Sequence, residues 1–469
     1  MSELVERIWS RDPTVWTGKD EAKWLGWLDE PTRMAEDVDL LLQFADSLVD
    51  RIDAVVLLGM GGSSLAPEVI EQTFRQETFH VLDTTHPQAI RDLEAQLDLP
   101  RTLFVSASKS GSTLETRSHT DYFWERNPSG SNWIAITDPG SDLEKLARQR
   151  EFAAVFFGEP TIGGRYSALS AFGMVPAALM GVDVTVLLER AQEMAEACRG
   201  AEGNPGLELG LSLGEGWRAG RDKICITPNP GGFGLWVEQL LAESTGKQGK
   251  GLIPAPDEPG DGPDRQAQEL RLSGEYELGQ EFFRWEFATA VAGSILGINP
   301  FDQPDVQSAK DKTREVLSSG APPDIAPQGS AEELYAQARA GDYVCIQAFV
   351  NPTPANETRV LALADQARSA TGCVVTHGFG PRYLHSTGQL HKGGPPNGVF
   401  IQLTGEDKED MAIPGAGYGF STLKAAQALG DLQALRDAGR RVIRVHLAGK
   451  QTQGVEQLIQ LMQKALRKR

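Results

Sequence analysis

A chain of 469 residues is too long for a single hydrophobic core, so its length predicts two domains. Its formal net charge of -19 would repel nucleic acids and anionic membranes, which argues against both as partners. The four cysteines are widely spaced and form no CxxC pair, so they indicate the reduced thiols of a cytoplasmic protein, not a zinc site or a disulfide framework.

Short apolar runs recur along the chain, each followed by turn residues and a helix-like segment. The first set lies at Val55–Leu58, Phe79–Leu82, Leu103–Ser106, Trp133–Ile136 and Ala153–Phe157. The second set follows a Gly-rich stretch, at Lys223–Ile226, Tyr343–Phe349, Cys373–Thr376, Val399–Leu403 and Val442–Val445. Apolar strands that alternate with helices indicate parallel sheets covered on both faces. The sequence therefore predicts an α/β fold of two three-layer α/β/α domains, each with a mostly parallel sheet.

The most apolar stretch of the chain is Ser167–Leu188, which Pro176 and Asp183 interrupt. We expect a buried helix followed by a strand there, because a membrane span would need an unbroken apolar run. The segments 257–264 and 318–329 are rich in Pro, Gly and Asp and are predicted to be loops.

The first predicted strand runs into a glycine turn, Gly59–Ser64, and then into a helix. Gly61 and Gly62 would let backbone N–H groups approach an anion at the start of that helix. A tight βα turn without a ligand is the plainer interpretation. The turn also partly matches a dinucleotide-binding loop, with Asp83 at the end of the next strand, although the third glycine of that fingerprint is missing.

The third predicted strand leads into Ser106–Thr116, which packs six hydroxyl residues and one lysine into eleven positions. Hydroxyls, helix-start amides and one ammonium group together suit a phosphate monoester. Serine and threonine also cap helices, but capping requires only one hydroxyl. We therefore interpret this loop as a phosphate site, which a dinucleotide-binding protein would not need.

The stretch Ser108–Thr113 resembles the sugar-isomerase domain of phosphosugar isomerases and their regulators. Three further segments, Gly163–Ser167, Glu238–Lys247 and Asn299–Lys310, resemble the arginine loop, catalytic helix end and lysine segment of glucose-6-phosphate isomerases, in the family's order. The chain's start and its region Gly378–Gln402 look most like the isomerase half of bifunctional transaldolase–isomerase proteins. From this resemblance we expect the chain to lack the transaldolase half.

This resemblance implies two sugar-isomerase domains, at residues 1–200 and 201–469, and interconversion of D-glucose 6-phosphate and D-fructose 6-phosphate. It implies a sugar phosphate substrate, no cofactor and no metal, and it allows a homodimer. The residues that it assigns to substrate and phosphate binding are Gly62, Ser63, Ser108, Lys109, Ser110, Thr113, Thr116 and Gln239.

The chemistry requires a carboxylate that moves a proton between C2 and C1 through a cis-enediol. Glu243 fits this role, with Gln239 one helical turn earlier and Gly246 as the expected helix stop, so that the negative helix end would raise its pKa. Arg165 would stabilise the enediolate as a fixed cation. The resemblance makes Lys310, in a helix expected to begin near Asp302–Pro304, an acid–base contact in ring opening.

The ring-opening histidine has two candidates. His385, in Tyr383–Gln389, resembles the family's His-Ser segment and is our choice, while His391 is the alternative. The family usually places this segment before the lysine, whereas here it follows Lys310. The other histidines, His80, His86, His119, His377 and His446, show no metal-ligand spacing.

Two other functions fit parts of the pattern. A phosphosugar-binding regulator would use the serine loop but would need no base at Glu243. A nicotinamide-dinucleotide oxidoreductase would use the first glycine turn instead.

Overall fold

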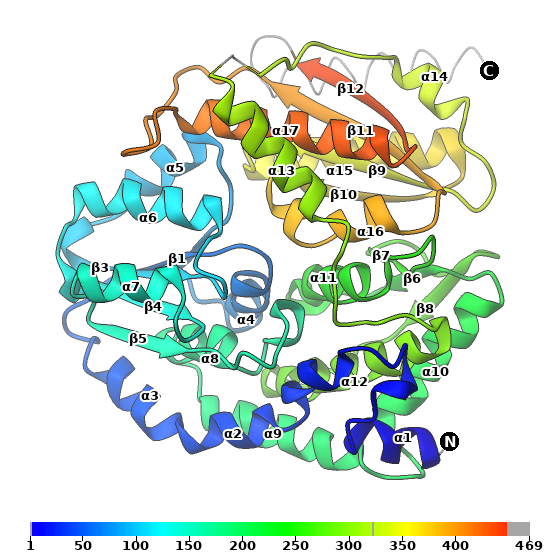
Figure 1. The fold of residues 1–469 in the computed structure, drawn as a ribbon, viewed down its shortest axis with the longest axis horizontal. Helices are drawn as coiled ribbons and strands as arrows, with labels where there is room; N and C mark the ends of the chain where they lie inside the picture. Colours follow the sequence, from blue (N-terminus) through cyan, green and yellow to red (C-terminus); the bar gives the residue numbers. More distant parts are fainter. Residues whose placement is uncertain (1, 321–322, 448–469) are drawn as a thin grey trace. The chain divides into compact units, whose positions relative to one another are not determined.

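A computed structural model describes residues 2–320 and 323–447 of the chain (Figure 1). The chain divides into two compact units. Among the described residues, unit 1 comprises 2–83, 97–245 and 252–302, and unit 2 comprises 84–96, 246–251, 303–320 and 323–447. Each unit is assembled from three stretches of the chain. The domain boundary expected between residues 200 and 201 stays a prediction.

The larger sheet of unit 1 has five parallel strands in the order β2-β1-β3-β4-β5. These strands are β1 (Ala54–Leu58), β2 (Phe79–Leu82), β3 (Thr102–Ala107), β4 (Trp133–Thr137) and β5 (Ala154–Phe157). Strands β3 and β4 are buried along their whole length, as expected for a parallel sheet covered by helices. All five strands lie where the apolar runs predicted them.

Unit 1 also contains a three-stranded parallel sheet in the order β7-β6-β8. It is formed by β6 (Lys223–Ile226), β7 (Ile253–Pro256) and β8 (Arg265–Gln268). The prediction of β6 was right, but its grouping with the second set of strands was wrong. β7 and β8 were missed because one is half proline and the other, Arg-Gln-Ala-Gln, has no apolar pattern.

Unit 2 has a four-stranded parallel sheet in the order β10-β9-β11-β12. Its strands are β9 (Tyr343–Phe349), β10 (Val374–Phe379), β11 (Gly398–Gly405) and β12 (Arg441–Leu447). The predicted α/β class with parallel sheets is thus confirmed.

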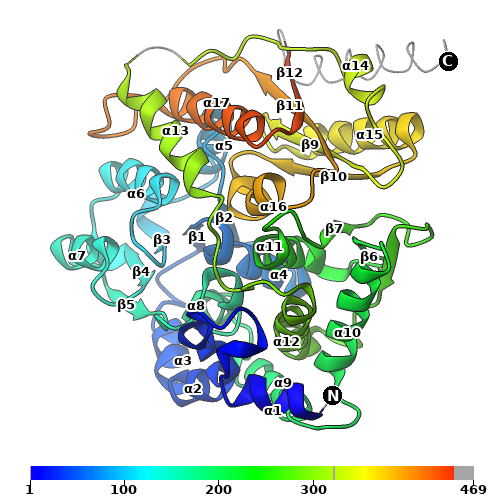
Figure 2. The same cartoon turned by 45° about the vertical axis from the view of Figure 1, so that its right-hand side comes forward.

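Helices cover these sheets. Those of unit 1 are α1 (Ser2–Trp9), α2 (Glu30–Glu36), α3 (Val38–Asp46), α4 (Leu65–Phe74), α6 (Leu114–Arg126), α7 (Asp142–Gln149), α8 (Ala171–Leu179), α9 (Val184–Ala197), α10 (Pro205–Arg218), α11 (Phe233–Thr245) and α12 (Leu278–Leu296). Those of unit 2 are α5 (Pro87–Glu94), α13 (Gln307–Ser318), α14 (Ala331–Tyr335), α15 (Pro354–Thr371), α16 (Gly388–Gly393) and α17 (Phe420–Asp437). In unit 2, α13 lies along α17, as Figure 2 shows. Within the described ranges, no helix is both long and apolar enough to cross a membrane.

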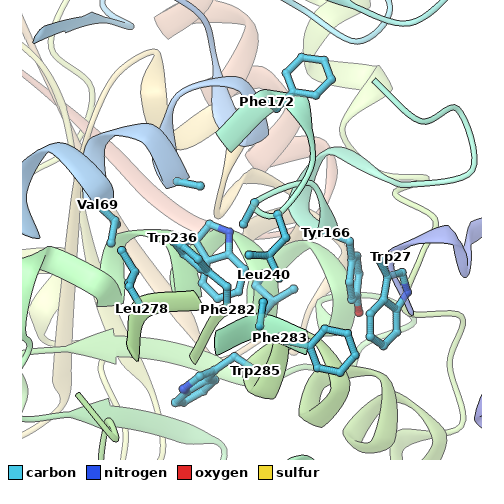
Figure 3. Packing of buried hydrophobic residues seen from close by; sticks show 14 of the residues in the cluster. Trp27, Val69, Tyr166, Phe172, Trp236, Leu240, Leu278, Phe282, Phe283 and Trp285 are labelled. Atoms are coloured by element: carbon cyan, nitrogen blue, oxygen red, sulfur yellow. The ribbon is translucent and has the colours of Figure 1, made fainter. Parts of the chain in front are cut away.

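The core of unit 1 is built around α11 and α12. Trp236 of α11 packs against Phe282 of α12 with ring centroids 4.8 Å apart, and Trp27 contacts Phe283 at 5.8 Å (Figure 3). Such aromatic pairs bury large apolar areas and fix the helices that carry them. The end of α11 is therefore attached to a rigid core.

The strand expected near the end of Ser167–Leu188 is absent; α8 and α9 cover this stretch instead. The side chain of Asp183 accepts hydrogen bonds from the backbone N–H groups of Thr185 and Val186, so it caps α9 and starts a helix where an apolar strand was predicted.

His391, on α16, belongs to the interior of unit 2. Its Nδ1 lies 3.3 Å from Gln347 Nε2 and its Nε2 lies 3.6 Å from Cys345 Sγ, both on β9. The ring also packs edge-on against Phe400 of β11, at 5.0 Å. Burial, with the nearby charges of Lys392 and Arg440, holds the pKa of His391 well below its usual value. The folded protein therefore keeps this imidazole neutral.

This burial predicts an acid-sensitive stability. Below about pH 6.5 the unfolded chain protonates His391 while the folded chain does not. The free energy of unfolding therefore falls by about 1.4 kcal/mol for each unit by which the pH is lowered. His391→Gln should remove this contribution and flatten the pH dependence of stability between pH 6.5 and 5. Urea unfolding at several pH values measures it, with His385→Gln as the control at a half-buried histidine. Equal slopes for the wild type and His391→Gln would contradict the prediction.

Candidate functional site

The two predicted phosphate loops follow neighbouring strands of the five-stranded sheet. The loop with Gly62 and Ser63 follows β1, and the loop from Ser108 to Thr116 follows β3 (Figure 1). In the order β2-β1-β3-β4-β5, the connection from β1 leads to β2, and the connection from β3 leads to β4. The two connections therefore run toward opposite edges of the sheet. Ligands of open parallel sheets bind at the carboxyl ends of strands at such a switch point, so the fold brings both loops to one favourable position.

Gly62 lies against the arginine loop. A Cβ atom at this position would come within 2.1 Å of the carbonyl oxygen of Gly164, so no larger residue fits without a backbone shift. Ser167 Oγ also donates a hydrogen bond of 3.4 Å to the carbonyl of Gly62. Glycine is required here by the close approach of two loops, both of which were predicted to be functional.

The hydroxyls of the serine loop pair with one another. Ser108 Oγ lies 2.9 Å from Thr113 Oγ1, and Ser110 Oγ lies 2.9 Å from Ser112 Oγ. Thr113 is the N-cap residue of α6, yet its side chain makes no capping hydrogen bond. Thr113 therefore does not cap the helix, while Ser108 and Ser110 accept hydrogen bonds from the backbone N–H groups of Gly111 and Ser112, at 3.1 and 3.3 Å. Ser110 is exposed and Ser108 is buried, so the loop spans the surface and the interior.

Two other residues of this loop differ in their surroundings. Lys109 donates hydrogen bonds to Asp138, at 2.7 Å, and to the carbonyl of Glu159, at 3.0 Å. A bound anion would share this ammonium group with Asp138. Thr116 lies in the first turn of α6, and its buried Oγ1 has no hydrogen-bond partner among the described residues.

Arg165 is almost completely buried and bridges three segments of unit 1. Its Nη1 lies 3.6 Å from Glu243 Oε2, and its Nε donates a 2.9 Å hydrogen bond to Ser244 Oγ. Its Nη2 donates to the carbonyls of Pro300 and Asp302, at 2.8 and 2.9 Å. A guanidinium is planar and always charged, so these partners fix a positive charge next to the Glu243 carboxylate.

Glu243 lies in the last turn of α11, which ends at Thr245, one residue before the predicted stop at Gly246. Gln239 Nε2 donates to Glu243 Oε2 at 3.4 Å from one turn earlier. The side chain of Glu243 keeps 11% of its surface exposed, so it is confined but accessible. A carboxylate that is held by an amide and a guanidinium, with one edge open, can accept and return a proton.

Lys310 lies in unit 2 and is exposed. The prediction that its helix begins near Asp302–Pro304 was wrong, because α13 begins at Gln307. The preceding backbone is engaged elsewhere: the N–H of Asp305 donates to Gln389 Oε1 at 2.9 Å. Lys310 is therefore in the first helical turn rather than the second.

His385 is also in unit 2, half-buried at the end of a 3-10 turn. Its segment is anchored to α17: Tyr383 donates to Asp431 Oδ2 at 2.7 Å, and Lys392 donates to Asp431 Oδ1 at 2.6 Å. Burial raises the pKa of Tyr383, so its hydroxyl stays protonated and remains a donor. His391, in contrast, is the buried core histidine described above.

Unit 2 also has a pocket of about 360 Å³ at the carboxyl ends of β9 and β11. None of the predicted site residues lines it. Its ionic lining residues are two lysines, Lys408 and Lys424, and four carboxylates, Glu406, Asp407, Glu409 and Asp410. This excess of negative charge makes the pocket unsuited to a phosphate ester.

Unit 1 thus contains all of the predicted site residues except Lys310 and His385. Sequence reasoning missed Ser244 and the carbonyl groups of Pro300 and Asp302, which hold Arg165. Ser244 could have been found, because it is the residue after Glu243 in the same motif. The carbonyl groups give no sequence signal, since every residue has one.

Part of the chain is similar to known glucose-6-phosphate isomerases. A family model described as phosphoglucose isomerase matches residues 43–218. A glucose-6-phosphate isomerase of Trichormus variabilis is 33% identical over 216 residues, which are 42% of this chain and 41% of that protein. Another, of Gloeothece citriformis, is 31% identical over 269 residues, 52% of this chain and 49% of that protein.

The matched part thus spans less than half the length of these curated relatives. Among solved structures, a glucose-6-phosphate isomerase from Chlamydia trachomatis is 17% identical, with a TM-score of 0.50 over 68% of this chain and 78% of that one, which supports the fold alone. The matched segment contains both phosphate loops and Arg165. Residues 43–218 of this chain are thus similar to the phosphoglucose isomerase family.

Proposed function

We propose that the chain catalyses the reversible isomerisation of D-glucose 6-phosphate and D-fructose 6-phosphate. The observation that carries this proposal is the buried contact between Arg165 and Glu243, at 3.6 Å. A protein that only binds a sugar phosphate needs no carboxylate held in this way beside a fixed cation.

Each of these two residues has one role in the proposed proton transfer. Glu243 removes the proton from C2 of the open-chain aldose and returns it to C1. The C2 hydroxyl loses its proton to become a carbonyl, and the C1 carbonyl oxygen gains a proton to become a hydroxyl, so one proton passes in net from O2 to O1. Arg165 stabilises the negative charge of the cis-enediolate between these steps. Gln239 orients the carboxylate through its 3.4 Å hydrogen bond.

Phosphate binding is assigned to the loops with Gly62 and Ser63 and from Ser108 to Thr116. This assignment is supported by their position at a switch point of the sheet and by hydroxyls that do not cap α6. The dinucleotide alternative loses support, because Asp83 is buried and accepts a hydrogen bond from Ser64 Oγ at 3.4 Å. A ribose would find no free carboxylate at that strand end.

Ring opening is assigned to His385 and Lys310. The choice of His385 over His391 is supported by burial: His391 lies in a core and stays neutral, while His385 is half-buried. We further propose a cytoplasmic enzyme that acts on a small-molecule sugar phosphate and allows a homodimeric assembly.

The first test is a coupled assay for fructose 6-phosphate formation, with EDTA present, on the wild type and on Glu243→Gln. The wild type should be active, and Glu243→Gln should lose about 10²–10⁴-fold in kcat with little change in substrate affinity. Glu238→Gln, on the same helix, is the matched control and should keep its activity. An inactive wild type that still binds the sugar phosphate would instead favour a regulator. Retention of more than a tenth of kcat by Glu243→Gln would exclude Glu243 as the base.

A second test separates ring opening from proton transfer. His385→Ala should slow turnover of glucose 6-phosphate at least tenfold more than turnover of an open-chain tetrose phosphate, because only the cyclic substrate needs a proton moved to its ring oxygen. His391→Gln, compared at neutral pH, should show no such preference. Equal slowing of both substrates by His385→Ala, or a cyclic-selective loss in His391→Gln alone, would overturn this assignment.

A further inference from the structure

Gln389, the second residue of α16, is completely buried and uses its amide group on two other segments of unit 2. Its Oε1 accepts a 2.9 Å hydrogen bond from the backbone N–H of Asp305. Its Nε2 donates to the carbonyl of Gly246, at 2.9 Å, and to Asp305 Oδ2, at 2.5 Å. The partners fix the orientation of the amide, because a donor faces Oε1 and two acceptors face Nε2.

The three joined positions lie next to the proposed catalytic groups along the chain. Gly246 directly follows α11, whose last turn carries Glu243. Asp305 leads into α13, whose first turn carries Lys310. Gln389 itself lies four residues after His385. One side chain thus connects the segments that carry three different catalytic groups.

The side chain of Gln389 is closely packed against Gly393 and Asp305. A Cβ atom at Gly393 would come within 2.2 Å of Asp305 Oδ2 and 2.7 Å of Gln389 Nε2. A second connection runs parallel to the first, since the N–H of Gly249 donates to the carbonyl of Gly393 at 2.9 Å. The segment 246–251 is therefore attached to α16 at two points.

We propose that Gln389 is a positioning residue of the isomerase, which fixes the lysine and histidine segments to the chain that leaves the glutamate helix. The inference rests on the proposed function. Gln389 acts through other groups and need not touch the substrate. Displacement of acid–base groups by about 1 Å costs roughly 10²-fold in rate, so loss of this connection should reduce kcat more than substrate affinity.

The first experiment compares Gln389→Met with Gln402→Met in the full chain. Gln402 is the matched control: it is equally buried in unit 2, and its amide binds the carbonyl of Ala428, the guanidinium of Arg444 and the hydroxyl of Tyr383, so it does not join the segments that carry Glu243 and Lys310. Gln389→Met should lower kcat at least tenfold while KM changes less than threefold; Gln402→Met should keep kcat within threefold. Circular dichroism and the thermal midpoint establish that both variants are folded at the assay temperature.

The second experiment uses Gln389→Glu, which keeps an acceptor for the N–H of Asp305 and places two carboxyl groups together. Like charges raise the pKa of such a pair, so acidification protonates one group and restores a donor. Its kcat relative to the wild type should therefore rise at least threefold between pH 8 and pH 6. The pH dependence of Gln389→Glu still tests the positioning role if Gln389→Met does not fold.

The outcomes are distinct. If the wild type has no isomerase activity, the proposed function fails. If the wild type is active but folded Gln389→Met keeps its kcat, loses no more than Gln402→Met, or the Gln389→Glu ratio is independent of pH, the positioning role is overturned.

Discussion

The buried guanidinium of Arg165 is the interaction on which the rest of the candidate site depends. A buried cation is costly unless its N–H groups are satisfied, and here Ser244 and two backbone carbonyls satisfy them. The same bonds hold the arginine loop against the end of α11 and against residues 300–302. Because Gly62 contacts the arginine loop, the position of the first phosphate loop is set by this arrangement as well.

Much of the fold could be predicted from short apolar runs and the turn residues that follow them. Ten strands coincide with predicted apolar runs, because strands covered on both faces must be continuously apolar. β7 and β8 could not be found, since proline and glutamine give no strand pattern, and β6 was grouped with the wrong sheet. Sheet membership depends on pairing between distant segments, which a local pattern does not encode. Asp183 shows that one capping carboxylate can outweigh an apolar stretch.

The site was predicted from loops and motifs, and the fold brings most of its residues into unit 1. Arg165 and Glu243, 78 positions apart in sequence, are in contact, as their proposed roles require. The start of α13 was predicted too early, because a backbone contact with Gln389 replaces the expected cap. In the structure, burial separates His385 from His391, and burial is a property of the folded chain that the five intervening residues do not reveal.

The interleaving of the two units also constrains how the protein folds and can be divided. The chain passes between the units at residues 83/84, 96/97, 245/246, 251/252 and 302/303. On the ribosome, the segment 84–96 emerges long before its partners in unit 2, where Thr85 bonds Gln427 at 2.8 Å and His86 bonds Asp407 at 3.1 Å. Thr85 and His86 therefore cannot form these contacts until most of unit 1 has been synthesised. No single proteolytic cut releases either unit whole, and a contiguous gene fragment would encode one unit only with pieces of the other.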